Sequence, residues 1–237
     1  MKKQLAIIGL STFTSRILEQ LQSFDCEILL IDKDPVIIEA YKDRVHRAFI
    51  ADVLNEATIG KLIPPDIDAV IVDPGDRIEV SILVTNYLKK LGIKKIFVRA
   101  ETDEHGEILN LIGANHVVYP NREAAMRLAP ILLSSHLLSY MPLSSDMVLA
   151  EVKAPPVILG QKLIESGIRD RMNLNVVGLR SEKTENEYTF VAPGYIFQEG
   201  DVLLIAGAEK DVRKFSDSIL IKENAGLTSM FSRLFNR

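Results

Sequence analysis

A chain of 237 residues that is 47% hydrophobic and 25% charged has the composition of a folded globular protein, and it is long enough for two modest domains. Its formal net charge of −4 excludes the broad basic surface that nucleic acids or anionic bilayers attract. The single cysteine, Cys26, excludes an internal disulfide and a cysteine-rich metal site, and it points to a reducing compartment.

Strand-like and helix-like segments alternate through the first half of the chain. The apolar runs that predict strands cover residues 4–9, 27–32, 45–50, 68–73, 95–99 and 116–119. The segments that predict helices cover residues 12–23, the stretch that begins at 34–35, and residues 55–61, 77–91 and 102–112. Asp34 and Pro35 suit a helix start, and Gly113 suits a helix end. Six apolar strands separated by amphipathic helices predict an α/β fold, a doubly wound parallel sheet of the Rossmann type.

The second half begins with an apolar helix predicted at 123–140, in which Pro130 is expected to produce a kink. The pattern then changes to short strands at 147–152, 174–180, 189–191 and 202–206, with helices at 161–166 and 209–216. This mixture predicts a smaller α+β domain. We therefore expect a first domain at 1–141, a second at 146–222, and a weakly amphipathic tail at 223–237.

The turn after the first strand is a candidate phosphate site, because a helix that starts there offers unpaired N–H donors and a partial positive charge. The turn contains Gly9, the first glycine of the dinucleotide pattern G-x-G-x-x-G. Ser11 and Thr14 occupy the positions of the other two glycines. The motif alone is therefore weak.

Acidic residues at neighbouring strand ends strengthen this candidate site. Asp32 ends the second strand, where a carboxylate binds the ribose hydroxyls of an adenosine ligand. Asp52 follows the third strand, and Gly75 follows the fourth. Asp73 also lies at a strand end, where an unpaired carboxylate would repel phosphates. The alternative is that Gly9 makes only a tight turn and that the aspartates are solvated caps.

Short segments in both halves carry a family resemblance. They are AIIGL (6–10), LIDKD (30–34), IAD (50–52), AVIV (69–72), FVRA (97–100), IGANHVVYP (112–120), LGQKL (159–163), NVVGLR (175–180) and EGDVLLI (199–205). With these segments the chain resembles the RCK family, the regulators of K⁺ conductance, and in particular the Trk/Ktr-type peripheral subunits of bacterial potassium uptake systems. The resemblance covers roughly residues 4–218.

This resemblance implies a regulatory subunit and not an enzyme. Such proteins form homodimers and rings that dock on the cytoplasmic face of a K⁺-translocating membrane subunit, and the helix at 123–140 matches one exchanged between partners. ATP, ADP or NAD(H) in the first domain gates the pore, and cyclic di-AMP binds the second domain of some members. The implied cofactor-binding residues are Gly9, Leu10, Ser11, Thr12, Phe13, Asp32, Lys33, Asp52, Val53, Asp73, Gly75 and Arg99.

The chain departs from the family at several of these positions. Family turns commonly read G-x-G-R-F-G, whereas Ser11, Thr12 and Thr14 stand at the second glycine, the arginine and the third glycine. Asn121 stands where an acidic residue often helps to hold a phosphate-bound cation, while Arg99 matches a basic position near the phosphates. We therefore expect weakened recognition of triphosphates.

No catalytic or metal-binding set is visible in the sequence. The four histidines are scattered, and neither a G-x-S-x-G elbow nor an H-E-x-x-H motif occurs. Arg169, Arg171 and Arg180 are candidates for a cyclic dinucleotide, although ordinary surface charge explains them better. No apolar run reaches the roughly 18 residues of a membrane span, so we expect no direct membrane insertion. The alternatives are an NAD(P)-dependent oxidoreductase and a ligand-free RCK-like scaffold.

Overall fold

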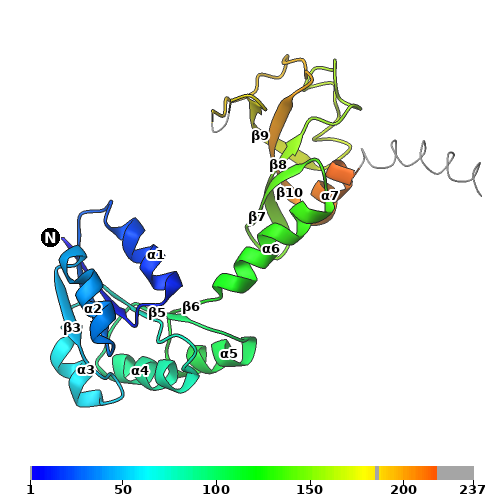
Figure 1. Ribbon diagram of the computed structural model, residues 1–237. Helices are drawn as coiled ribbons and strands as arrows, with labels where there is room; N and C mark the ends of the chain where they lie inside the picture. Colours follow the sequence, from blue (N-terminus) through cyan, green and yellow to red (C-terminus); the bar gives the residue numbers. More distant parts are fainter. Residues whose placement is uncertain (1, 185–186, 218–237) are drawn as a thin grey trace, which may run out of the picture. The chain divides into compact units, whose positions relative to one another are not determined.

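The computed structural model describes residues 2–184 and 187–217, and their contacts form two units divided after Asn121 (Figure 1). The strands of the first unit are β1 (Lys3–Ile8), β2 (Cys26–Asp32), β3 (Arg47–Ile50), β4 (Ala69–Val72), β5 (Ile96–Arg99) and β6 (His116–Val118). Its helices are α1 (Thr12–Leu21), α2 (Pro35–Tyr41), α3 (Glu56–Leu62), α4 (Ile78–Lys90) and α5 (Asp103–Ile112), with a 3₁₀ turn, η1, at Lys42–Arg44.

The six strands of the first unit form one parallel sheet in the order β3-β2-β1-β4-β5-β6. Both of its faces are covered, as the near-continuous apolar strands require. Ile7 of β1 packs with Leu18 of α1 and Ile38 of α2 on one face of the sheet. Ile8 of β1 packs on the other face with apolar side chains of α3, α4 and α5, such as Ile59. Figure 1 shows α1 and α4 on opposite sides of the sheet. The prediction of a Rossmann-type doubly wound sheet is confirmed.

Side chains at the helix ends explain why these helices begin and end where they do. The Asp34 carboxylate accepts the Val36 N–H at 2.8 Å, and Pro35 occupies the first turn of α2, as predicted. Thr102 caps α5, which ends at Gly113 in the left-handed conformation with φ of 115°. Local sequence therefore sets these boundaries.

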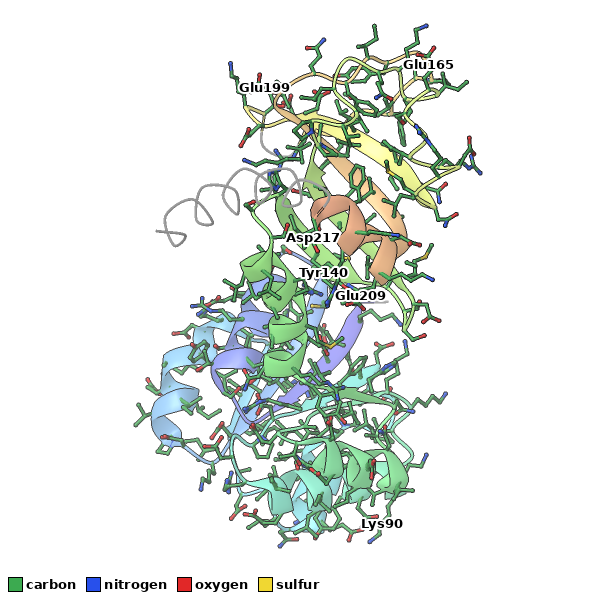
Figure 2. All side chains as sticks on the ribbon, turned by 90° about the vertical axis from the view of Figure 1, so that its right-hand side faces the viewer. Lys90, Tyr140, Glu165, Glu199, Glu209 and Asp217 are labelled. Atoms are coloured by element: carbon green, nitrogen blue, oxygen red, sulfur yellow. The ribbon has the colours of Figure 1, made fainter. Side chains whose placement is uncertain are left out.

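The described residues of the second unit form an antiparallel sheet and two helices, the first of which begins at the division between the units. Its strands are β7 (Leu137–Pro142), β8 (Met147–Lys153), β9 (Leu174–Ser181) and β10 (Asp201–Ala208), in the order β7-β8-β10-β9. The helices are α6 (Pro120–Leu133) and α7 (Glu209–Asp217). Val212 and Phe215 of α7 are buried in the apolar cluster of this sheet. Tyr140 of β7 lies near Glu209 at the start of α7 (Figure 2), and burial, aided by the Glu209 carboxylate, raises the pKa of Tyr140.

Three local predictions for the second half are wrong. The helix predicted at 123–140 ends at Leu133, and residues 137–142 form β7, which pairs with β8. No helix covers 161–166, where the backbone makes turns and a single bridge between Lys162 and Ile196. Residues 189–191 form no strand and supply only a bridge from Thr189 to Leu179. The predicted tail at 223–237 lies outside the described residues.

The limits of the functional domains, 1–141 and 146–222, stay a prediction, although β7 places residues 137–142 in the sheet of the second unit. Across the part of the chain that the structure describes, no helix combines the length and the apolar character that a bilayer crossing needs.

Candidate functional site

A pocket of about 220 Å³ opens at the carboxyl ends of β1, β2 and β4. The loops after β1 and β4 diverge here to opposite faces of the sheet, which is the position where open α/β sheets bind ligands. The residues that line the pocket are Ile8, Gly9, Leu10, Ser11, Ile31, Asp32, Lys33, Asp34, Ile37, Ala51, Asp52, Val53, Asp73, Pro74, Gly75 and Arg77.

Gly9 lets the turn after β1 pass close to the end of β4. Its φ is +83°, and a Cβ at this position would lie against the Asp73 carbonyl, 2.7 Å from the carbonyl carbon and 3.0 Å from Pro74 Cα. The Gly9 N–H donates to the Ile31 carbonyl at 2.8 Å. The predicted tight turn therefore requires glycine for its dihedral angle and also for its close approach to β4.

The start of α1 is capped by side chains of the same turn. The Ser11 hydroxyl oxygen accepts the N–H of Phe13 at 3.0 Å and that of Thr14 at 3.4 Å. In return the Thr14 hydroxyl oxygen accepts the Ser11 N–H at 2.8 Å, which completes a capping box. The two residues that replace glycines thus use the N–H groups that a phosphate would otherwise bind.

Asp73 lies directly beneath this helix start and is 1% exposed. One of its carboxylate oxygens accepts the Ser11 hydroxyl. The other accepts the Gly75 N–H at 3.2 Å and pairs with the Arg99 guanidinium at 3.0 Å. Arg99 also forms an ion pair with Glu101. We call Ser11, Thr14, Asp73 and Arg99 the turn cluster, and its hydrogen bonds give both oxygens of a buried carboxylate a partner, since a buried carboxylate left without one would be costly.

Asp32, the residue expected to bind ribose, lines the pocket from the end of β2. One of its oxygens accepts the Leu10 N–H at 2.8 Å, and the other accepts the Asp34 N–H at 2.9 Å. Each carboxylate oxygen has a further lone pair, so both remain able to accept a ligand hydroxyl. Asp52 accepts the Leu54 N–H at 3.1 Å and lines the pocket from the end of the neighbouring strand β3.

Most of the predicted cofactor-binding residues come together in this pocket, and three do not line it. Those that line it are Gly9, Leu10, Ser11, Asp32, Lys33, Asp52, Val53, Asp73 and Gly75. Thr12 is exposed on the first turn of α1, Phe13 follows it, and Arg99 is held against Asp73. Two apolar residues of the pocket wall, Ile37 and Ala51, are missing from the predicted set. Ile37 follows Asp32 closely in the sequence and Ala51 directly precedes Asp52, so their positions could have indicated them.

These residues fit one half of an adenine nucleotide and not the other. Carboxylate oxygens at Asp32 suit ribose hydroxyls, and apolar side chains such as Ile37 and Val53 offer a wall for a base. Phosphates at this turn would meet a capped helix start and the Asp73 carboxylate instead of free N–H groups. In the described ranges 2–184 and 187–217, no group of three or more metal-binding side chains stands together to hold a bridging cation.

A second pocket, of about 290 Å³, lies in the second unit and is lined by the segment that precedes β9, by the start of β9 and by Pro193. Its residues are Leu163, Ile164, Gly167, Ile168, Arg169, Asp170, Leu174, Asn175, Val176 and Pro193. Of the three candidate arginines, only Arg169 lines it. Arg171 donates to the Ser166 carbonyl at 2.9 Å, and Arg180 pairs with Glu151 at 3.0 Å.

Comparisons with known families match both parts of the chain. The model of the TrkA-N domain matches residues 5–120, and that of the TrkA-C domain matches residues 147–220. The chain is 34% identical over 220 residues to the Ktr system potassium uptake protein C of Bacillus subtilis (strain 168), covering 93% of this chain and 99% of that protein. It is 28% identical over 215 residues to the Ktr system potassium uptake protein A of the same organism, covering 91% and 96%.

Solved structures share the fold of the chain. The crystal structure of the GsuK RCK domain has a TM-score of 0.64 at 18% identity and covers 91% of this chain. The GsuK channel bound to NAD has a TM-score of 0.62 at 18% identity and also covers 91%. The chain spans 48% of the first of these and 39% of the second.

Proposed function

We propose that this chain, which belongs to the TrkA-N and TrkA-C (RCK) family and is homologous to the Ktr system potassium uptake proteins C and A, regulates potassium uptake. In this proposal it is a cytoplasmic subunit that gates a separate K⁺-translocating membrane subunit. The near-complete coverage of a Ktr protein at 34% identity supports it. The family is one of Ktr regulatory subunits and not of enzymes, which argues against an oxidoreductase.

The observation that carries a ligand-controlled function is the pocket at the switch point with Asp32 on its wall. We propose that an adenosine-containing ligand, of the class of ATP, ADP and NAD(H), occupies it, with Asp32 on the ribose and Asp52, Val53 and Ile37 along the base. The GsuK channel, which has the same fold, has been solved bound to NAD. The predicted cofactor-binding residues remain part of this proposal.

Regulation of this kind needs no chemistry on the ligand. A ligand that binds one conformation of the assembly more tightly than another shifts the population toward it, and a membrane partner that prefers that conformation responds. We propose that the assembly is a homodimer or a ring of this chain, peripheral at the inner face of the membrane through its partner. The side chains of Leu132 and Leu133 on α6, which are 83% and 78% exposed in the single chain, support such an assembly.

A second ligand is proposed for the second unit because its pocket combines a cation, an amide and apolar walls. Arg169 suits a phosphate, Asn175 suits a base edge, and Ile164 and Ile168 supply apolar contacts. A cyclic dinucleotide such as cyclic di-AMP carries two phosphates and two bases in symmetric positions. It would therefore be bound by two copies of the chain related by a two-fold axis.

A thermal-shift screen tests the function. The ligands are adenosine, ATP, ADP, AMP, NAD⁺, NADH and cyclic di-AMP, and an extrinsic dye is required because the chain has no tryptophan. A ligand that binds only the native state raises the melting temperature in a saturable way. We expect Asp32→Ala to abolish the rise for adenosine-containing ligands, and Arg169→Ala to abolish that for cyclic di-AMP.

Matched variants separate binding from general loss of charge. Asp25→Ala and Lys210→Ala remove exposed charges outside the two pockets, and each variant is compared with its own ligand-free melting temperature. If no adenosine-containing ligand shifts the wild type, the ligand-free scaffold is the better description of the first unit. A shift that survives Asp32→Ala would place the ligand elsewhere.

A further inference from the structure

The start of α1 already holds an anion, and that anion belongs to the protein. The Asp73 carboxylate accepts the hydroxyl of Ser11, and the Ser11 oxygen accepts the N–H groups of Phe13 and Thr14. The carboxylate therefore reaches the positive end of the helix through one hydroxyl group. A phosphate at this turn would need the same space and the same donors.

The turn has few donors left for a ligand. Four of its backbone N–H groups point at protein oxygens. They are the N–H groups of Leu10, on Asp32; of Ser11, on Thr14; and of Phe13 and Thr14, both on Ser11. A phosphate that bound these N–H groups would have to break the capping box. Each hydrogen bond that it gained would replace one that the protein had lost, so the net gain in binding free energy would be small.

The charges around the pocket also oppose a phosphate. Arg99, the basic side chain that pairs with Asp73, is 15% exposed and forms a further ion pair with Glu101. The pocket itself is lined by four aspartates and by two basic side chains, Lys33 and Arg77. A diphosphate would enter a site in which carboxylates outnumber cations, and the partly buried Arg99 beside that site is already paired with two carboxylates.

We propose that the turn cluster is a built-in substitute for phosphate, and that the pocket takes an adenosine-like nucleoside without a phosphate at its 5′ end. This inference rests on the proposed function in so far as the pocket binds an adenosine-containing ligand. Asp32 serves the ribose, while Asp73 occupies the position of the phosphate. Adenosine then binds as tightly as ADP or more tightly, which reverses the order expected of a phosphate-binding turn.

Titration calorimetry on the full chain tests this inference with adenosine and ADP as probes. In the wild type we expect ADP to bind no more tightly than adenosine. Asp73→Asn removes the buried negative charge with almost no change in shape and leaves Glu101 as the one carboxylate that pairs with Arg99 among the ion pairs described above. We expect this variant to raise the affinity for ADP relative to adenosine by about tenfold or more.

Asp34→Asn is the matched control, because it removes one negative charge from the same pocket but leaves the turn cluster intact. We expect it to change the ratio of the two affinities by about threefold or less, since its carboxylate lies at the exposed start of α2. Circular dichroism checks that each variant is folded. If Asp73→Asn does not fold, the double variant Ser11→Gly with Asp73→Ala, which removes both side chains together, carries the same expectation.

The outcomes separate this inference from the proposed function. Wild-type protein that binds ADP about tenfold more tightly than adenosine overturns the inference and leaves nucleotide regulation standing. The inference is overturned in the same way if Asp73→Asn leaves the ratio of affinities unchanged. If the wild type binds neither probe, ligand control through this pocket fails, and ADP binding gained by Asp73→Asn still supports the substitute for phosphate. Binding by neither protein overturns both.

Discussion

At the scale of single residues, Gly9 is the position at which the pocket tolerates least change. The glycine combines a left-handed φ of +83° with a backbone approach that leaves no room for a Cβ. Gly75, which also lines the pocket, has a similar φ of +70° but has nothing within 4 Å of the place where a Cβ would be. A comparison of substitutions at the two glycines therefore separates the free-energy cost of a left-handed backbone from the cost of a steric clash.

We expect Gly9→Ala to lower the free energy of unfolding by about 3 kcal/mol, because left-handed strain and a steric clash with the end of β4 add together. Gly75→Ala has the strain alone and is expected to cost about 1 kcal/mol. Urea unfolding of both variants measures the difference. Equal costs for the two variants would contradict the close approach of Gly9 to Asp73.

The residues of the pocket were partly predictable from the sequence. Gly9 and Asp32 follow from strand ends and a known spacing, and both line the pocket. The sequence indicated that an unpaired Asp73 would repel phosphate. It did not indicate that Ser11 and Arg99 would bind the Asp73 carboxylate. These partners lie 62 and 26 residues from Asp73 along the chain, so only the sheet order brings them together. Local patterns cannot reveal such contacts.

At the scale of elements, a buried histidine joins two neighbouring helices of the first unit. His105 of α5 is 4% exposed, and its Nε2 lies 2.7 Å from the Ser81 hydroxyl of α4. Its Nδ1 accepts the Glu101 N–H at 3.3 Å, which fixes the neutral ring in one tautomer with the proton on Nε2. Burial lowers the pKa of His105 from 6.5, against a smaller opposing effect of the Glu101 carboxylate.

This lowered pKa predicts a dependence of stability on pH. Below pH 6.5 the unfolded chain binds a proton that folded His105 does not, so the free energy of unfolding falls as the pH decreases and levels off below the folded pKa. Unfolding by urea between about pH 5 and 7.5 should show this fall in the wild type and less of it in His105→Gln. The control is His116→Gln, at an exposed histidine of β6. Parallel curves for wild type and His105→Gln would contradict the prediction.

The regular elements of the first unit were predictable, whereas those of the second unit were predictable only in part. Each strand of the parallel sheet is a short, largely apolar run, and capping residues mark where several of the helices that follow begin. The run from Leu137 to Pro142 follows α6 with no glycine between, so it has the pattern of a continuing helix. The Ser134 side chain, which accepts the N–H groups of His136 and Leu137, and pairing with β8 turn it into a strand. The Ser134 contacts are local, but the pairing with β8 is tertiary and leaves no local signal.

At the scale of the whole molecule, α6 presents apolar side chains that the single chain does not bury. Met126, Leu128, Leu132 and Leu133 are 50%, 56%, 83% and 78% exposed, and α6 has no buried residue. A helix with an apolar surface of this kind is typical of contacts between subunits. The proposed homo-oligomer would bury it.

We expect the double variant Leu132→Glu with Leu133→Glu to lower the molar mass in solution to that of a smaller oligomer or the monomer. Carboxylates at a subunit contact would lose their hydration on assembly and would repel each other. Light scattering coupled to size exclusion measures the mass. Val36→Glu, which adds a charge at a 73% exposed valine of α2, is the control and should keep the mass of the wild type. An unchanged mass in the double variant would remove α6 from the contact.

The order of strands in the second sheet has a consequence for folding during synthesis. The first sheet grows as the chain is made, and its last strand, β6, only adds to an edge. In the second sheet β10 is the last of the described strands to be made, yet it lies between β8 and β9 and is the only one of them that pairs with β9. A ribosome that has translated as far as residue 200 therefore carries a nascent chain with a β7–β8 hairpin and a β9 that still lacks this neighbour. During the interval before β10 emerges, we expect the unpaired edge of β9 to be the part of the second sheet most open to wrong pairing with other chains.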